Sequence, residues 1–302
     1  MADAATSRAT SFTGNRWILG ARPRTLPAAI VPVMVGTAAA VGVGPGLSAW
    51  RALAAGIVAL ALQVATNFVN DYADGERGTD TDRIGPIRLV GSGLASVEQV
   101  KAAAVLSFIV AVLAGVALAI DVGPELLAVG AVSILAGWGY TGGPKPYGYM
   151  GLGEVFVFVF FGVVATAGST YVQIKQITPL SLICSCAVGF LAVALLVINN
   201  LRDRPLDQDA GKRTLAVRIG DTRTRQLYVV LMLLTAAAIL GAGIVRWPAV
   251  LGLLGLTLMI NPVRDVLDGL AGEHLITVLA DTGRTQLVTG IALSIGLVVG
   301  GV

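Results

Sequence analysis

The sequence predicts an all-α, polytopic membrane protein with nine transmembrane helices in one domain, residues 1–302. First, 55% of the residues are hydrophobic and 13% are charged, and the mean hydropathy is +0.81, far from the composition of soluble domains. Second, nine runs lack Asp, Glu, Lys and Arg, and as helices they can cross a bilayer core of about 30 Å. Third, the runs lack the alternation of barrel strands, and lipid tolerates only helices or closed barrels.

The nine runs follow one another along the chain, separated by polar loops. In order they are 26–43, 52–70, 102–120, 126–143, 155–172, 180–200, 226–245, 247–263 and 285–302. A signal peptide is the alternative for residues 1–43, but the first run exceeds the usual apolar region of about 7 to 15 residues. We therefore expect it to remain as a helix after a flexible tail at residues 1–15. The eighth run is short and ends near Asn261 and Pro262.

The loops on the two sides of the predicted helices differ in their basic residues. With nine helices the termini lie on opposite sides, and 18 of the 21 Lys and Arg residues fall on the side of the N-terminus, leaving Arg51, Lys175 and Arg246. Because Lys and Arg are enriched in cytoplasmic loops, we expect a cell-membrane protein with its N-terminus in the cytoplasm and its C-terminus outside. The net charge of +3 then reflects topology and anionic lipid, since no nucleic-acid-binding motif is present.

Two polar clusters follow the second and sixth runs. The first is "FVNDYADGERGTDTDR" at 68–83, and the second is "NNLRDRPLDQDAGKRT" at 199–214. Both runs cross from outside to inside, so both clusters emerge on the cytoplasmic face and converge on one site. Their similar designs, Asn-Asp-x-x-Asp and Asn-x-x-Asp-x-x-x-Asp, suggest an internal duplication.

The aspartates in each cluster have the spacing of residues that share a helix face. Asp71 and Asp74 are three residues apart, which aligns them on the last turn before Gly75 ends the helix. Asp203 and Asp207 are four residues apart and would stand about 6 Å from each other along a regular helix.

Pro205 lies between the two aspartates of the second cluster. Proline removes a backbone donor and disfavours helix at the preceding residue. We therefore expect the sixth helix to kink or stop near Leu201.

Carboxylates at a helix C-terminus meet the negative end of the helix dipole, which costs about 0.3–1 kcal/mol each. A cation should offset that cost. Hard oxygen donors without a nearby histidine or thiolate favour Mg²⁺, which commonly binds through one or two carboxylates and the phosphates of a substrate. The basic residues expected to hold a diphosphate beside it are Arg77, Arg83, Lys145, Lys212 and Arg213.

The alternative interpretation is that both clusters are ordinary polar loops in which acids and bases are mixed for solvation. Asn67, Asn70, Asn199 and Asn200 argue against it, because they lie at or inside membrane depth. Unpaired amides are costly there. The clusters are thus better explained by a binding site.

With these clusters the sequence resembles the UbiA-type intramembrane prenyltransferases, whose hallmark is two aspartate-rich motifs at the cytoplasmic ends of spans two and six. Four stretches are most similar to the branch that acts on 1,4-dihydroxy-2-naphthoate in menaquinone biosynthesis: "ARPRTLPAAIVPV" at 21–33, "NDYADGERGTDTDRIGPIRLVGSG" at 70–93, "YTGGPKPYGYMGLGE" at 140–154 and "NNLRDRPLDQDAGKRTLAVRIGD" at 199–221. The first motif departs from the wider family, where its last position is Asp. Here that position is Gly78, and the next acid is Asp80.

The resemblance implies a central cavity, a cap of cytoplasmic loops and a side opening to lipid for the prenyl tail. Mg²⁺ would neutralise the leaving diphosphate of a polyprenyl diphosphate, and the naphthoate ring would attack the allylic cation. Loss of CO₂ would then give a demethylmenaquinone. The implied metal ligands are Asn70, Asp71, Asp74, Asp80, Asp203 and Asp207.

The resemblance also implies roles for residues that contact the substrates. Tyr140 would stabilise the allylic cation through its ring face, the alternative being a tyrosine of the membrane interface. Lys145 and Arg22 would hold the diphosphate or the acceptor carboxylate, although the turn around Lys145 is also typical of a plain glycine- and proline-rich connection. Asn67 and Asn200 are expected to contact substrate.

Two other functions remain open at this stage. One is a UbiA-type enzyme with another aromatic acceptor, such as 4-hydroxybenzoate. The other is a transporter of divalent cations or small solutes, which would need polar groups at mid-membrane depth in several helices. Prenyl length and oligomeric state do not follow from the sequence.

Overall fold

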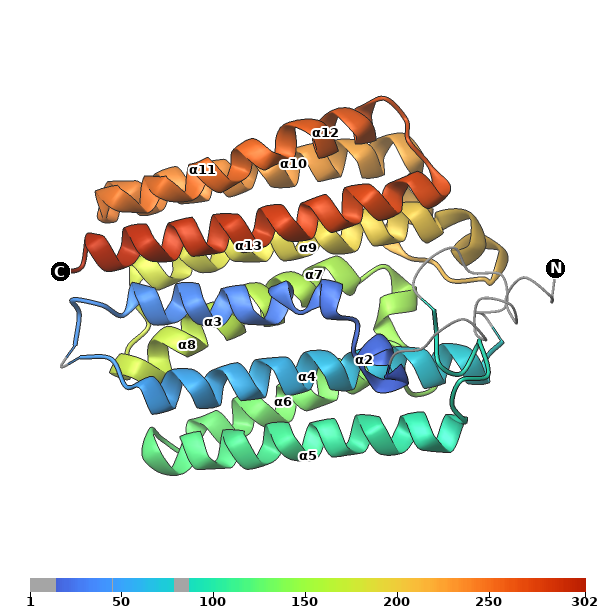
Figure 1. Ribbon diagram of the computed structural model, residues 1–302, viewed down its shortest axis with the longest axis horizontal. Helices are drawn as coiled ribbons and strands as arrows, with labels where there is room; N and C mark the ends of the chain where they lie inside the picture. Colours follow the sequence, from blue (N-terminus) through green and yellow to red (C-terminus); the bar gives the residue numbers. More distant parts are fainter. Residues whose placement is uncertain (1–14, 45, 79–86) are drawn as a thin grey trace.

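The computed structural model describes residues 15–44, 46–78 and 87–302, and these residues form helices and turns with no strand among them. The expected tail at residues 1–15 lies outside the described residues except for Asn15, which caps the first helix by accepting a hydrogen bond from the Trp17 backbone. The long helices run side by side (Figure 1), with α2 near one end of the bundle and the last turn of α13 at the other. This arrangement confirms the all-α prediction.

The helices begin and end as follows. They are α2 (Arg16–Ala21), α3 (Pro27–Ala39), α4 (Ala49–Glu76), α5 (Val97–Asp121), α6 (Glu125–Gly139), α7 (Gly153–Val157), α8 (Ala165–Ile174), α9 (Pro179–Asp209), α10 (Leu215–Val245), α11 (Gly252–Leu256), α12 (Ile260–Leu267) and α13 (Leu275–Val299). Short 3₁₀ turns are η1 (Pro23–Thr25), η2 (Tyr147–Met150), η4 (Trp247–Leu251), η5 (Thr257–Met259) and η6 (Gly272–His274), and η3 (Phe158–Val164) is π-helical.

Seven helices in the described ranges are long and apolar enough to cross a membrane. The pair Arg16–Thr25 and Pro27–Ala39, bent by 52°, makes an eighth if it is counted as one span. The fourth predicted run forms α6, which has only 15 residues. A helix therefore stands at each predicted run and the protein is a multi-pass membrane protein, but the count of nine spans is not confirmed.

The expectation was that Pro205 would kink or stop the sixth helix near Leu201, and the helix does not stop there. Helix α9 continues through Pro205 to Asp209. The proline removes one backbone hydrogen bond near the end of the helix, whereas the preceding turn, including Arg202 and Asp203, is buried against the rest of the bundle. This packing keeps the second polar cluster helical.

Helix α9 is the most buried of the long helices and lies against α3, α8, α10 and α13. Its apolar side chains, such as Leu191 and Ile198, join Tyr228 of α10 and Leu275 of α13 in the largest buried cluster. On another side Gly162 of η3 meets α9 so closely that an added Cβ would lie 2.6 Å from the Cα of Gly189. Small residues permit such close contact between membrane helices.

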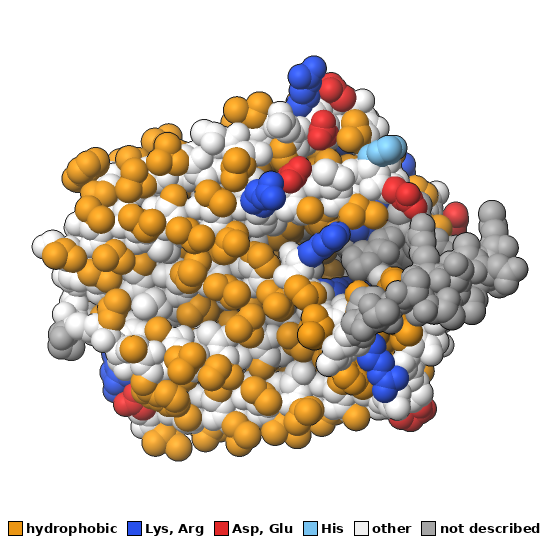
Figure 2. All heavy atoms as spheres, viewed as in Figure 1, with side chains coloured by type: hydrophobic (Ala, Val, Ile, Leu, Met, Phe, Trp, Pro, Cys, Tyr) orange, Lys and Arg blue, Asp and Glu red, His pale blue; other side chains and the backbone are white. Residues whose placement is uncertain are grey.

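Large apolar side chains cover the outside of the bundle, among them Ile120 and Ile244, which are 84% and 88% exposed. Figure 2 shows hydrophobic side chains over most of one face and charged side chains mainly toward the end that carries α2. Such a surface is stable in lipid, which solvates apolar groups as well as a protein core does.

The C-terminal ends of α4 and α9 lie at this same end of the bundle (Figure 1). The segment 140–152, which joins α6 to α7 and contains η2, lies there too. The fold therefore brings both polar clusters and the glycine-rich turn to one end, as their sequence positions predict.

Candidate active site

A cavity of about 970 Å³ opens within the bundle. Side chains of α3, α4, α6, α9 and the α7–η3 helix form much of its wall, and most of the wall is apolar. Polar residues in or next to the two clusters line part of the remainder: Asn67, Asn70, Asp74, Asn199, Asn200, Asp203, Asp207 and Lys212. The cavity is thus a long apolar chamber with one polar end.

Asp203 and Asp207 of the second cluster both line this polar end. Asp203 accepts from Arg202, whose Nε and Nη2 lie 2.7 and 2.8 Å from its two carboxylate oxygens. Arg202 also donates to Asn199 at 2.7 Å. Both partners of the ion pair are buried, and Arg202 lines the cavity itself, so a charge-assisted pair stands in the wall.

In the first cluster, Asp74 lines the cavity, and its partners among the described residues include three side chains. Arg88 lies 3.2 Å away, Lys212 lies 3.1 Å away, and the hydroxyl of Tyr149 donates a hydrogen bond. Burial raises the pKa of the Tyr149 phenol, with the negative charge of Asp74 as a further cause, so the hydroxyl keeps its proton. Asp74 therefore sits in a cationic and donor-rich pocket.

Lys212 links the two clusters. Its Nζ lies 3.1 Å from an oxygen of Asp74 and 4.0 Å from an oxygen of Asp207, and 4.7 Å from the ring centroid of Tyr149. The ammonium group is thus placed between carboxylates from α4 and α9.

Asp71 has a different environment from Asp74. It is fully buried, lies outside the cavity wall, and accepts hydrogen bonds from the backbone amides of Leu89 and Val90 at 2.8 and 2.9 Å. The shared face expected from the three-residue spacing does not make the two acids equivalent, because a difference of about 60° around the helix turns Asp71 toward the 88–90 segment. Asp71 anchors this segment, from which Arg88 reaches Asp74.

Several predicted cations lie outside the cavity wall. Arg77 donates to the carbonyls of Thr141 and Gly143 at 2.6 and 2.7 Å, so it braces the glycine-rich turn. Lys145 and Arg213 are exposed. Arg83 and Asp80 fall in the segment 79–86, outside the described residues.

Arg88 and Arg202 were missed as site residues, although both line the cavity. A signal existed for Arg202, because an arginine two residues after Asn200 is still at membrane depth and needs an acidic partner. No comparable signal pointed to Arg88, whose position depends on Asp71. Arg22 does line the cavity as expected, with a left-handed backbone (φ 53°) that ordinary residues seldom adopt.

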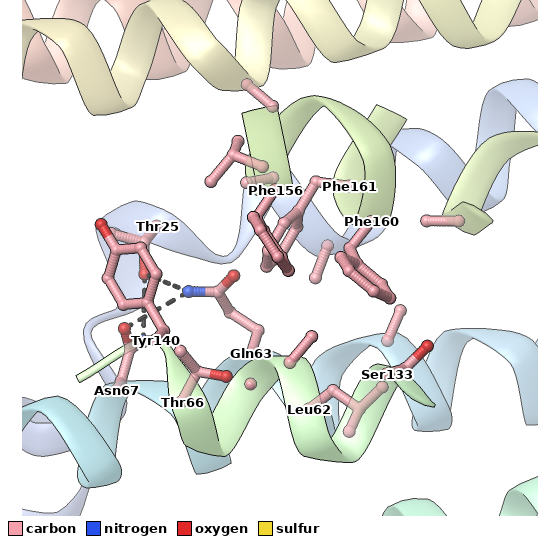
Figure 3. Close-up of a pocket in the computed structure, with 18 of the residues that line it drawn as sticks. Thr25, Leu62, Gln63, Thr66, Asn67, Ser133, Tyr140, Phe156, Phe160 and Phe161 are labelled. Carbon is pink, nitrogen blue, oxygen red and sulfur yellow. Dashed lines mark hydrogen bonds between the residues drawn. The ribbon is translucent and has the colours of Figure 1, made fainter. Parts of the chain in front are cut away.

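Asn67 takes part in a buried polar network with two residues that sequence patterns did not single out. Its Nδ2 donates to the carbonyl of Ala21 at 2.9 Å and to Thr25 at 3.2 Å, and Gln63 donates to Thr25 and to Asn67 at 3.3 Å each (Figure 3). This network fastens α4 to the bend between α2 and α3. Asn70 also lines the cavity, and its Oδ1 accepts from the hydroxyl of Thr141.

An aromatic wall follows the polar end. Tyr140 packs edge-on to Tyr147 with centroids 5.6 Å apart, and Tyr147 stacks on Phe156 at 3.9 Å. Figure 3 shows Phe156, Phe160 and Phe161 pointing from the α7–η3 helix into the space above α4. Ring faces near a polar end can stabilise a cationic group, and the rings also exclude water.

The donor set fits a hard divalent cation whose shell is completed by a ligand. Among the described residues, no three Asp, Glu, His or Cys side chains are grouped closely enough to hold a metal ion. Asp74, Asp203 and Asp207, with the amides of Asn70 and Asn200, nevertheless line one end of one cavity. Mg²⁺ commonly binds in this way, through few carboxylates plus substrate phosphates.

The sequence is similar to curated proteins over nearly its full length. It is 47% identical to 1,4-dihydroxy-2-naphthoate octaprenyltransferase of Mycobacterium tuberculosis over 94% of this chain and 97% of that protein. It is 45% identical to the protein of the same name from Mycobacterium leprae over 95% and 97% of the two chains.

The fold is similar to that of a UbiA homologue from Archaeoglobus fulgidus whose structure was solved bound to GPP and Mg²⁺, with a TM-score of 0.62, 14% identity, and coverage of 92% of this chain and 99% of that one. The family itself is recognised over residues 29–268. These similarities confirm the resemblance drawn from the motifs and argue against the transporter alternative. The chain belongs to the UbiA prenyltransferase family.

Proposed function

We propose that this protein transfers a polyprenyl group from a polyprenyl diphosphate to 1,4-dihydroxy-2-naphthoate, releasing diphosphate and CO₂ and giving the reduced, hydroquinone form of a demethylmenaquinone. The names of its relatives support the choice of acceptor. The observation that carries the proposal is the shape of the cavity, in which acids and cations of both clusters occupy one end of a long apolar chamber. A prenyl diphosphate has this same division between a charged head and an apolar tail.

At the polar end, Arg88, Arg202 and Lys212 supply positive charge to the diphosphate. Asp74, Asp203 and Asp207, with Asn70 and Asn200, would hold Mg²⁺, which neutralises charge that develops on the leaving diphosphate. Asp71 contributes indirectly by anchoring the segment that carries Arg88.

In the reaction, the bond between the first prenyl carbon and the diphosphate oxygen breaks, and its electron pair leaves with the diphosphate. The electron-rich ring carbon that bears the acceptor carboxylate forms the new carbon–carbon bond. The carboxylate then leaves as CO₂, and its bonding electrons restore aromaticity. Tyr140 and the neighbouring rings face the allylic cation, and Arg22 is placed to bind the acceptor carboxylate.

The protein would act in the cell membrane with its polar end at the cytoplasmic face, an orientation that the excess of Lys and Arg on that side supports. Water-soluble diphosphate would then leave into the cytoplasm. The prenyl tail would extend into the apolar part of the cavity.

An acceptor panel with the purified protein tests the proposal. With one prenyl diphosphate and Mg²⁺, we expect turnover of 1,4-dihydroxy-2-naphthoate with release of one CO₂ per product, little turnover of 4-hydroxybenzoate, and no turnover with EDTA. Preference for 4-hydroxybenzoate would overturn the acceptor assignment. Equal turnover with and without EDTA would overturn the role of the metal.

A further inference from the structure

A buried glutamate of α7 stands behind the second cluster. Glu154 is 7% exposed and lies outside the cavity wall. Its Oε1 accepts a hydrogen bond from Nδ2 of Asn200 at 2.9 Å, and its Oε2 is buried with no hydrogen-bond partner among the described residues. A carboxylate at membrane depth is costly unless it is paired. The contact between Glu154 and Asn200 therefore needs a functional explanation.

The chemistry of the contact fixes which way the amide of Asn200 points. In the structure Nδ2 of Asn200 donates to Oε1 of Glu154, as an ionised Glu154 requires, because a carboxylate only accepts hydrogen bonds and of the two ends of an amide only the nitrogen donates. The nitrogen of Asn200 is therefore held toward Glu154. Since the amide is planar, its oxygen lies on the other edge, and Asn200 lines the polar end of the cavity.

This orientation matters for any cation in the cavity. Hard divalent cations bind carbonyl and carboxylate oxygens, whereas an amide NH₂ group directed at them would repel them. Asn200 stands one helical turn before Asp203, which also lines the polar end. With its oxygen facing the cavity, Asn200 adds a neutral donor to the acids there.

The corresponding residue of the first cluster is held differently. Asn70 accepts from the hydroxyl of Thr141, and a hydroxyl both donates and accepts, so that contact is compatible with either orientation of the amide. The carboxylate of Glu154 is compatible with one orientation only. The two clusters therefore differ in how firmly their asparagine is oriented.

We propose that Glu154 is a positioning residue that holds the Asn200 amide with its oxygen toward the polar end of the cavity and so makes Asn200 an oxygen donor to a divalent cation. This inference rests on the proposed function, because the divalent cation that Asn200 would bind is the one proposed for that same active site. Glu154 itself touches neither the cation nor the substrates.

An exchange of the two side chains tests the proposal. Asn200→Asp sets two carboxylates against each other, whereas Glu154→Gln combined with Asn200→Asp restores a donor and an acceptor and again leaves an oxygen facing the cavity. Both substitutions keep the side-chain size, so a folding defect is not expected. Glu154→Leu removes the acceptor altogether.

The measurement is the Mg²⁺ concentration that half-saturates the thermal stabilisation of the detergent-solubilised protein in the presence of farnesyl S-thiolodiphosphate, an unreactive analogue. We expect Glu154→Leu and Asn200→Asp each to raise this concentration about 10- to 100-fold, as is usual when the partner of a metal ligand is lost. The double variant should regain most of the lost affinity. Glu125→Leu is the control, because Glu125 also accepts from a single side chain, Tyr171, and Tyr171, unlike Asn200, does not line the cavity.

The outcomes separate the inference from the function on which it rests. If the unmodified protein shows no joint stabilisation by Mg²⁺ and the analogue, the proposed metal–diphosphate site fails. If it does, and Glu154→Leu leaves the half-saturating concentration unchanged, the positioning role fails. The positioning role also fails if the double variant binds Mg²⁺ no better than Asn200→Asp does, since the double variant again has an oxygen at residue 200 that can face the cavity.

Discussion

The two polar clusters are alike in sequence but are used differently by the fold. At the end of α9, Asp203 and Asp207 both line the cavity. At the end of α4, Asp74 lines it, while Asp71 is turned about 60° away around the helix and binds two backbone amides. The comparison teaches that a helical spacing predicts which residues share a face, but the neighbours of the helix decide what that face meets.

The sharpest test of this difference is removal of cavity-lining acids. Asp74→Asn and Asp207→Asn should each lower turnover by about 100-fold or more, because each removes a carboxylate that would hold the Mg²⁺ at the leaving diphosphate. Diphosphate release from purified variants measures this. Near-normal turnover in both variants would show that the two clusters do not share a site.

The next largest effect is expected at the cation between the clusters. Lys212→Met should raise the KM for prenyl diphosphate about tenfold, since a charge-assisted hydrogen bond contributes about 1.5–3 kcal/mol. Lys145→Met is the matched control in the same assay, because Lys145 is exposed and outside the cavity wall. An equal rise in both variants would mean that general surface charge attracts the substrate.

Substitution of Asp71 should lower the stability of the protein more directly than it lowers the rate of the reaction. Asp71→Asn leaves one of the two backbone amides of the 88–90 segment without an acceptor, which we expect to lower the free energy of unfolding by about 1–3 kcal/mol. Thermal unfolding in detergent without ligand measures this loss. A variant as stable as the parent but inactive would instead identify Asp71 as a metal ligand like Asp74.

The smallest effect is expected at Arg213, an exposed cation that sequence patterns assigned to the diphosphate. Arg213→Met should change turnover and KM by less than about twofold, as surface charges contribute little. Its backbone amide donates to the carbonyl of Tyr149, and this contact survives the substitution. A large rise in KM would show that the loop brings Arg213 to the cavity when substrate binds.

Much of this architecture follows from the sequence, because apolar runs and helix ends are local properties. The helices, the shared end of the two clusters and the position of Asp74, Asp203 and Asp207 at that end could all be predicted in this way. The role of Asp71 could not, since it depends on a chain segment that returns to α4 from beyond residue 86. The continuation of α9 through Pro205 likewise depends on packing that no local pattern reveals.

The cations were predicted least well, for a related reason. Long basic side chains reach in several directions, so a position near an acid in sequence does not fix their partner. Arg77 turns to backbone carbonyls of the glycine-rich turn, whereas Arg88 and Arg202 reach the acids. An arginine at membrane depth is a more informative signal of a site residue than a basic residue that is merely close to an acid in the sequence.

The place of Lys212 has one further consequence. An ammonium group between Asp74 and Asp207 means that the protein supplies its own counterion to these acids when no metal is bound. At the proposed metal site, entry of a divalent ion would then be an exchange, in which the lysine gives up carboxylate contacts and a phosphate oxygen receives it. The resting protein would keep both acid clusters folded in the presence of a chelator, and it would take up metal most readily together with a diphosphate.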